Sequence, residues 1–241
     1  MPPPDFSILI PLYNEQESLI PNIGRLLRFL EQGGMKAEIL LGSNGSTDAT
    51  ASIGRMLQEA FPGQIRFFHI DGRGLVGEVF VRAAEMASSP VLISIDADLP
   101  IDLEFITGAL KLLGENDIIV GSKLSGSQER SFHRILASQF YIACARVLLG
   151  LPYDDYSIGA KAYVIEPVRP LLGEIANDTN YVLDLLLAAR RRGLRITVLS
   201  VACSDLRSSR FRLFREGLIR FSHLFRVWVG SLMVHRSPRL P

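Results

Sequence analysis

The first half of the chain alternates short apolar runs with longer amphipathic segments, and this alternation constrains the fold more than any other feature. Strand-like runs are predicted over 6–10, 38–41, 65–70, 91–95 and 117–120. Helical spacing of apolar residues is predicted between them, over 17–32, from a cap at Ser46 or Thr47 to about 60, over 75–87 and over 101–113. Alternating strands and helices imply right-handed crossovers, so the sequence predicts an α/β fold with a mostly parallel, twisted sheet and flanking helices.

The second half follows a less regular pattern. A long amphipathic helix is predicted over 131–150, a strand over 160–165, a helix over 181–192 and a strand over 195–201. A last helix is predicted over 217–235, with an apolar stripe at Leu218, Phe221, Phe225, Trp228 and Leu232. These elements extend the same domain and add a C-terminal amphipathic helix.

Polar and glycine-rich clusters follow nearly every predicted strand of the first half. They are Tyr13-Asn14-Glu15, Ser43-Asn44-Gly45, Asp71-Gly72-Arg73-Gly74, Asp96-Ala97-Asp98 and Gly121-Ser122-Lys123. In an open parallel sheet the carboxyl ends of the strands form one rim, where ligands bind. Surface loops without a shared role would be divided between both rims, so the pattern predicts one binding site.

Asp96 and Asp98 directly follow a predicted buried strand. Carboxylate oxygens in this position can hold Mg²⁺ or Mn²⁺, and the cation can in turn hold a diphosphate. A solvated turn is the alternative for an isolated pair of this kind. The four histidines show no metal-ligand spacing, and Cys144 and Cys203 lie in apolar contexts, which argues against a zinc site or a disulfide framework.

Charge is distributed unevenly along the 241 residues. From Leu206 onward there are eight arginines and one acid, Glu216, whereas acidic residues predominate in the rest. A basic amphipathic tail favours an anionic membrane surface as a partner, and a helix packed on the domain with solvated arginines is the alternative. No nucleic acid partner is expected.

The longest apolar stretch, 135–151, is interrupted by Gln139 and Arg146, so no membrane span is expected. The first residues contain neither a basic nor an apolar region, so no signal peptide is expected.

Several motifs together resemble the family 2 glycosyltransferases. Pro11-Leu12-Tyr13-Asn14-Glu15 is similar to the family's first motif, and Ser43 to Thr50 is similar to Asp-Asp-Gly-Ser-Thr-Asp-Gly-Thr. Asp96-Ala97-Asp98 resembles its Asp-x-Asp motif, and Gly72-Arg73-Gly74 and Gly121-Ser122-Lys123 resemble its two later loops. Asp155 to Lys161 resembles a segment of the branch that glycosylates polyprenyl phosphates. The resemblance covers roughly residues 6–215.

This resemblance implies a GT-A nucleotide-diphospho-sugar transferase fold over 1–210, followed by a basic amphipathic tail over 211–241. It implies an inverting, Mg²⁺- or Mn²⁺-dependent hexosyltransferase at the cytoplasmic membrane face, with a nucleotide sugar as donor and a polyprenyl or dolichyl phosphate as acceptor. Whether a separate membrane subunit takes part stays open. The implied donor-binding residues are Pro11, Tyr13, Asn14, Glu15, Asn44, Arg73, Gly74, Asp96 and Ala97. Asp96 and Asp98 would be the metal ligands, Asp98, Asp155 and Lys123 would be catalytic, and Arg130, Arg134 and Arg210 would bind the acceptor phosphate.

The chain differs from the family pattern at Ser43-Asn44, where the family has two aspartates. An amide oxygen can accept the single N3–H of uracil but cannot face both donors of guanine with two oxygens, which favours a UDP-sugar over GDP-mannose. The difference also keeps alternatives open: a non-catalytic relative that binds a nucleotide or a partner, or a transferase with a non-lipid acceptor. A nucleotidyltransferase is disfavoured because no glycine-rich loop follows the first strand.

Overall fold

A computed structural model of the chain describes residues 3–99, 101–122, 128–129, 132–153, 156, 158–204 and 219–230. Seven strands form one sheet in the order β3-β2-β1-β4-β7-β5-β8. Their bounds are β1 Phe6–Leu12, β2 Ala37–Asn44, β3 Ile65–Ile70, β4 Val91–Ser94, β5 Ile118–Ser122, β7 Lys161–Val164 and β8 Ile196–Ser200. Neighbouring strands pair in parallel except at β7, which runs antiparallel to both β4 and β5.

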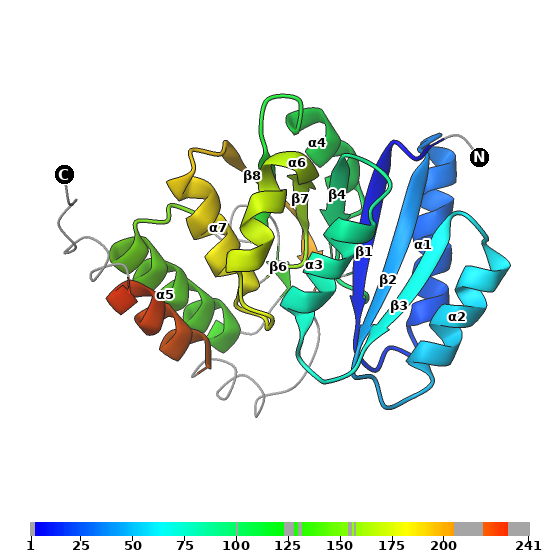
Figure 1. Cartoon of the computed structure of the whole chain (residues 1–241), viewed down its shortest axis with the longest axis horizontal. Helices are drawn as coiled ribbons and strands as arrows, with labels where there is room; N and C mark the ends of the chain where they lie inside the picture. Colours follow the sequence, from blue (N-terminus) through cyan, green and yellow to red (C-terminus); the bar gives the residue numbers. More distant parts are fainter. Residues whose placement is uncertain are drawn as a thin grey trace.

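Helices cover both faces of this sheet (Figure 1). One apolar cluster joins the sheet to α1 (Leu19–Gln32), α2 (Thr50–Ala60) and α4 (Glu104–Leu112). A second cluster joins the opposite face to α3 (Val76–Met86), α5 (Phe132–Leu149), α6 (Ile165–Val168) and α7 (Tyr181–Arg191). The central strands are buried on both faces, which explains why β1 is a near-continuous apolar run and why β2 is apolar from Ile39 to Leu41.

The predicted alternation is confirmed, with most boundaries within a few residues of those expected. One start was wrong: α2 begins at Thr50, because the hydroxyls of Ser46 and Thr47 bond to Asn14 instead of capping the helix. Three short features were not predicted. They are the four-residue helix α6, a 3₁₀ helix, η1 (Arg169–Glu174), and a two-stranded ribbon of β6 (Gln128–Glu129) and β9 (Cys203–Ser204).

The last helix described, over 219–230, lies beside α5 at one end of the molecule (Figure 1). Leu224 is buried in the domain, and Phe221 contacts Phe140 of α5 with ring centroids 5.5 Å apart. His223 and Asp184 of α7 approach to 2.7 Å between Nε2 and Oδ1. This helix is therefore packed on the domain, whereas Phe225 of the predicted stripe is exposed. The proposed boundary at 210/211 lies outside the described residues.

Candidate active site

The rim predicted from the sequence exists in the structure. The carboxyl ends of β3, β2, β1 and β4 follow one another along it, and the antiparallel β7 contributes its beginning instead of its end. Neighbouring strands are about 4.8 Å apart, so roughly 15 Å separates the end of β3 from the end of β4. The rim is thus long enough for an extended ligand that spans several strands.

The first two motifs interlock. Asn14 has a left-handed backbone (φ 53°), and its Oδ1 accepts the Thr47 N–H at 2.8 Å. The Glu15 N–H donates to Thr50 Oγ1 at 2.7 Å. The Gln16 N–H donates to Asp48 Oδ2 at 3.2 Å. These residues therefore join the loop after β1 to the loop after β2.

Side-chain partners within this pair of loops limit what two of its acids can do. Slight burial raises the pKa of Asp48, but hydrogen bonds from Thr50 and Gln16 outweigh it, so the pKa of Asp48 is lowered. The Glu15 carboxylate accepts the Ser18 hydroxyl at 2.5 Å. Asp48 is thus held ionised as a structural acceptor, and Glu15 already has one hydrogen bond within the protein.

Asn44 connects three strand ends. Its buried side chain donates from Nδ2 to the Leu12 carbonyl at 2.9 Å, and its Oδ1 accepts the Gly74 N–H at 3.1 Å. Both ends of the amide therefore bond to main chain of neighbouring loops. The amide oxygen from which a preference for uracil is predicted thus already accepts one hydrogen bond, from Gly74.

Half-buried Tyr13 and exposed Arg73 form the outer part of the same region. The Arg73 guanidinium lies over the Tyr13 ring, 4.7 Å from its centroid, in a cation–π contact. The loop of Arg73 also lies close to Gly45, because a Cβ at position 45 would be 2.7 Å from the carbonyl carbon of Gly72. Tyr13, Asn44, Arg73 and Gly74 are thus brought together at the ends of β1, β2 and β3.

Asp96 and Asp98 lie in a tight turn at the end of β4, and both are half-buried. The Leu99 N–H donates to the Asp96 carbonyl at 3.0 Å, with Leu99 in the left-handed region (φ 43°). Asn22 of α1 donates from Nδ2 to the carbonyl of Ala97 at 2.8 Å. Ala97 is buried, so its contribution to this turn is made through the main chain.

Two further groups interact with Asp96. The Gly159 N–H donates to Asp96 Oδ2 at 3.0 Å. Burial, and after it the charge of Asp96, raise the pKa of Tyr181 well above its ordinary value, so its hydroxyl stays protonated. The Asp96 carboxylate therefore accepts one main-chain hydrogen bond, and its charge acts on a tyrosine that stays neutral.

Among the described residues no three His, Cys, Asp or Glu side chains gather into a group that could hold a metal alone. Two carboxylates still fit Mg²⁺ or Mn²⁺, which commonly take one or two protein carboxylates and fill their remaining positions with substrate phosphates and water. The donor set at Asp96 and Asp98 therefore suits a cation that arrives with a diphosphate.

The other predicted site residues cannot be placed on this rim. Lys123, Arg130, Asp155 and Arg210 lie outside the described residues, and of Arg134 only the main chain, in α5, is described. Pro11 is half-buried in β1, level with Gly42 of β2.

A model of the family "Glycosyl transferase family 2" matches residues 7–159, which include β1 to β5, the rim and Gly159. The chain is a family 2 glycosyltransferase. The family and its α/β GT-A fold, expected from the motifs, are confirmed.

Among curated proteins, this glycosyltransferase resembles glycosyltransferase AglD of Haloferax volcanii, with 26% identity over 232 residues, 93% of this chain and 37% of AglD. It resembles polyprenol monophosphomannose synthase of Mycolicibacterium smegmatis with 24% identity, over 82% of this chain and 77% of that protein. An undecaprenyl-phosphate 4-deoxy-4-formamido-L-arabinose transferase of Sodalis glossinidius is 32% identical over 65% of this chain and 48% of its own length. The chain thus spans only about a third to a half of two of these relatives.

Among solved structures, the glycosyltransferase is similar to glucosyl-3-phosphoglycerate synthase of Mycobacterium tuberculosis in complex with UDP. The TM-score is 0.69 at 18% identity, over 93% of this chain and 80% of that one. A second structure of that enzyme, with Mn²⁺, UDP-glucose and phosphoglyceric acid, gives a TM-score of 0.65 at 17% identity, over 92% and 79%. At these identities the likeness establishes the fold.

Three interactions of the site were not predicted. Asn22 of α1 donates a hydrogen bond to the Ala97 carbonyl. In the sequence Asn22 is simply one of the polar residues of an amphipathic helix, so nothing indicates this bond. Tyr181 begins α7, more than 80 positions after Asp96, and no sequence signal connects them. Gly159 belongs to a motif that the sequence did reveal, but only the antiparallel course of β7 shows that it touches Asp96.

Proposed function

We propose that this enzyme is an inverting, metal-dependent glycosyltransferase that moves a hexose from a UDP-sugar to a polyprenyl or dolichyl phosphate. The observation that carries the proposal is the arrangement of the rim. Tyr13, Arg73 and Asn44 lie at the ends of β1 to β3, and Asp96 and Asp98 follow at the end of the adjoining β4. A nucleoside at the first group would extend its diphosphate toward the two carboxylates.

The chemistry needed from the protein is modest. A bound Mg²⁺ or Mn²⁺ would supply Lewis-acid stabilisation of the departing diphosphate. Asp96 and Asp98 would hold it, and the Tyr13 ring would present an aromatic face to the nucleotide, with Arg73 available to offset phosphate charge. In the transfer, an oxygen of the acceptor phosphate forms a bond to the anomeric carbon as the bond to the diphosphate breaks. The acceptor phosphate is already an anion at neutral pH, so little general-base help is required.

A likeness of fold adds support for a UDP-sugar to the argument from Asn44, whose amide oxygen can accept a second hydrogen bond beside that of the Gly74 N–H. The structurally similar glucosyl-3-phosphoglycerate synthase was solved with UDP-glucose and Mn²⁺. Support for a lipid phosphate comes from the names of the polyprenol and undecaprenyl-phosphate relatives. Lys123, Asp155, Arg130, Arg134 and Arg210 remain the proposed acceptor-side residues.

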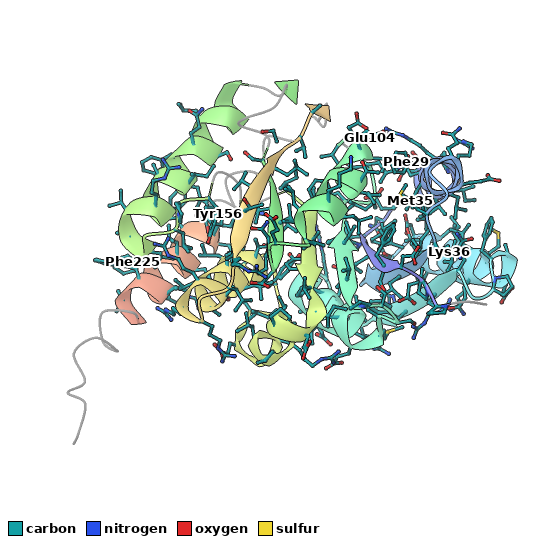
Figure 2. The ribbon with its side chains drawn as sticks, turned by 90° about the horizontal axis from the view of Figure 1, so that it is seen from above. Phe29, Met35, Lys36, Glu104, Tyr156 and Phe225 are labelled. Atoms are coloured by element: carbon teal, nitrogen blue, oxygen red, sulfur yellow. The ribbon has the colours of Figure 1, made fainter. Side chains whose placement is uncertain are left out.

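A lipid acceptor requires access to a membrane surface, and α5 offers one. Leu136, Phe140 and Val147 recur on one side of this helix and are between 56% and 82% exposed. Phe225, on the adjacent helix, is 57% exposed and lies at the outer edge of the molecule (Figure 2). Exposed Arg146 and Arg226 accompany these residues, which suits anionic headgroups.

No helix in the described part of the chain is long and apolar enough to cross a bilayer. From its exposed apolar residues we propose that the apolar side of α5, together with Phe225, rests in the headgroup region of the membrane. In this proposal α5 takes over part of the membrane contact that was predicted for the apolar stripe of the last helix, because Phe221 and Leu224 of that helix face the domain.

The activity is tested with a panel of UDP- and GDP-sugars, undecaprenyl or dolichyl phosphate in detergent, and Mg²⁺ or Mn²⁺. We expect transfer from a UDP-hexose that is lost on chelation and in Asp98→Asn. The matched control is Asp5→Asn, an exposed aspartate at the opposite end of β1. Transfer only from GDP-sugars would refute the choice of base, and metal-dependent nucleotide binding without transfer from any donor would favour a binding protein.

Membrane attachment is tested separately by flotation with vesicles of phosphatidylglycerol and phosphatidylcholine. We expect Phe140→Ser combined with Val147→Ser to lower the bound fraction several-fold. The control is Met56→Ser on α2, a residue 47% exposed at the far end of the molecule (Figure 1). Equal binding of both variants would refute the assignment of this surface and leave the donor site untouched.

A further inference from the structure

The segment that enters β7 runs directly past the metal-ligand candidate Asp96. Ser94 of β4 pairs with Lys161 of β7 in an antiparallel register. Continuing that register by two residues on each strand places Gly159 opposite Asp96. The hydrogen bond from the Gly159 N–H to Asp96 Oδ2, at 3.0 Å, agrees with this placement.

Position 159 has no room for a side chain. A Cβ there would lie 2.3 Å from Asp96 Oδ1, 2.4 Å from its Cγ and 2.7 Å from Oδ2. Gly159 does not lie in the left-handed region, unlike Gly74 with its φ of +84° and no neighbour near its Cβ position. A side chain at 159 would therefore have to displace the Asp96 carboxylate.

Neighbouring residues hold this segment from both sides. Lys161 is 1% exposed, and its ammonium donates to the Ile158 carbonyl. The Gly121 N–H of β5 donates to the Ala160 carbonyl at 2.9 Å. The main chain around Gly159 is thus fixed before any ligand binds, so its N–H is a preorganised donor.

We propose that Gly159 is a positioning residue that orients the Asp96 carboxylate for the cation. Its N–H engages Oδ2 in a charge-assisted hydrogen bond, and Oδ1, which takes no part in this bond, is the oxygen left for the metal. Groups that hold a metal ligand in this way typically change metal affinity or activity about 10- to 100-fold when removed. The inference rests on the proposed metal-dependent function.

The test is direct Mn²⁺ binding in the presence of UDP, followed by the loss of the free-ion EPR signal. Gly159→Ala is expected to weaken Mn²⁺ binding roughly 10- to 100-fold. The matched control is Gly173→Ala, where nothing lies within 4 Å of the added Cβ, and binding there should equal that of the wild type. In Asp96→Asn the further change Gly159→Ala should add no more than about twofold, because its effect runs through the lost carboxylate.

Each outcome bears on a different part of the reasoning. A wild-type enzyme that binds no Mn²⁺ with either UDP or GDP would overturn the metal-dependent function itself. Normal Mn²⁺ binding by wild type and an equal affinity in Gly159→Ala would overturn only the positioning role, as would additive effects in the double variant. If Gly159→Ala does not fold, Lys161→Met takes its place: it removes one of the contacts that hold the segment and adds no atom beside Asp96. A weaker Mn²⁺ affinity in Lys161→Met supports the inference, and an unchanged affinity refutes it.

Discussion

Substituting Gly45 by alanine should separate backbone strain from loop packing at the nucleotide end of the site. Gly45 and Gly34 both have left-handed backbones, with φ of +65° and +61°. Alanine at either position costs about 1–2 kcal/mol for that conformation alone. At Gly34 nothing lies within 4 Å of the added Cβ, whereas at Gly45 it would meet main-chain atoms of Gly72 and Arg73 at 2.7–2.8 Å.

Only a displacement of the 72–74 loop can relieve the contact at Gly45, because the clashing atoms are main chain. That displacement would strain the bond between the Gly74 N–H and Asn44 Oδ1. Overpacking of this kind costs roughly 1–3 kcal/mol, so Gly45→Ala should lose about 2–5 kcal/mol of unfolding free energy and Gly34→Ala about 1–2 kcal/mol.

Urea unfolding followed by circular dichroism measures both losses, and equal m-values would license their comparison. Isothermal titration with UDP supplies a second measure: Gly45→Ala should bind several-fold more weakly than Gly34→Ala, because the loop of Arg73 has moved. Equal losses of stability together with equal UDP affinities would refute the claim that the 72–74 loop is packed on Gly45.

Three further outcomes are expected. Asn44→Ala should lower the unfolding free energy by about 1–3 kcal/mol, because the Leu12 carbonyl and the Gly74 N–H lose their partner. It should also raise the donor KM with little change in kcat. The control in the same urea and kinetic assays is Asn177→Ala, at an exposed asparagine. Burial, aided by Asp184 and opposed by Arg220, raises the pKa of Tyr141 to about 12, so stability from its protonated form is present below pH 10 and is lost as pH rises through 12. Between pH 9 and pH 11 the unfolding free energy of Tyr141→Phe, measured in urea, should therefore fall by roughly 1 kcal/mol less than that of the wild type. Parallel plots of unfolding free energy against pH for the two proteins would contradict this. His223→Ala should speed amide hydrogen exchange over 219–230 by at least tenfold while exchange in β1 and β2 stays unchanged, because the contact with Asp184 ties this helix to α7.

Much of the fold could be predicted because its signals are local. Runs such as 65–70 are apolar and short, and the helix from 19 to 32 shows clear apolar periodicity, so strand and helix could be told apart. Local signals also placed the polar clusters on one rim. The antiparallel course of β7 depends on which strands it joins, which is a long-range property that no periodicity within 160–165 records.

The site was predicted less completely, for a related reason. Residue types revealed Asp96, Asp98, Tyr13 and Arg73, but a residue type does not reveal its partner. Asn44 was interpreted as a ligand for the base, and the structure shows both ends of its amide bonded to main chain. The exposed apolar side of α5 could not be predicted either. Tyr141 and Ile142 face the core while Phe140 and Val147 face outward, so the apolar residues of this helix do not form a single stripe.

The reversed direction of β7 divides the molecule in an order that matches the two proposed substrates. All the proposed nucleotide contacts come from residues 11–98, one uninterrupted stretch, and the segment delivered to the rim by β7 comes from after α5. Changes in length or composition between α5 and β7 need not disturb the pairing of β1, β2 and β3. The segment between α5 and β7 can therefore change during evolution while the proposed donor-binding residues stay the same. Position 159 is the exception, because it contacts Asp96.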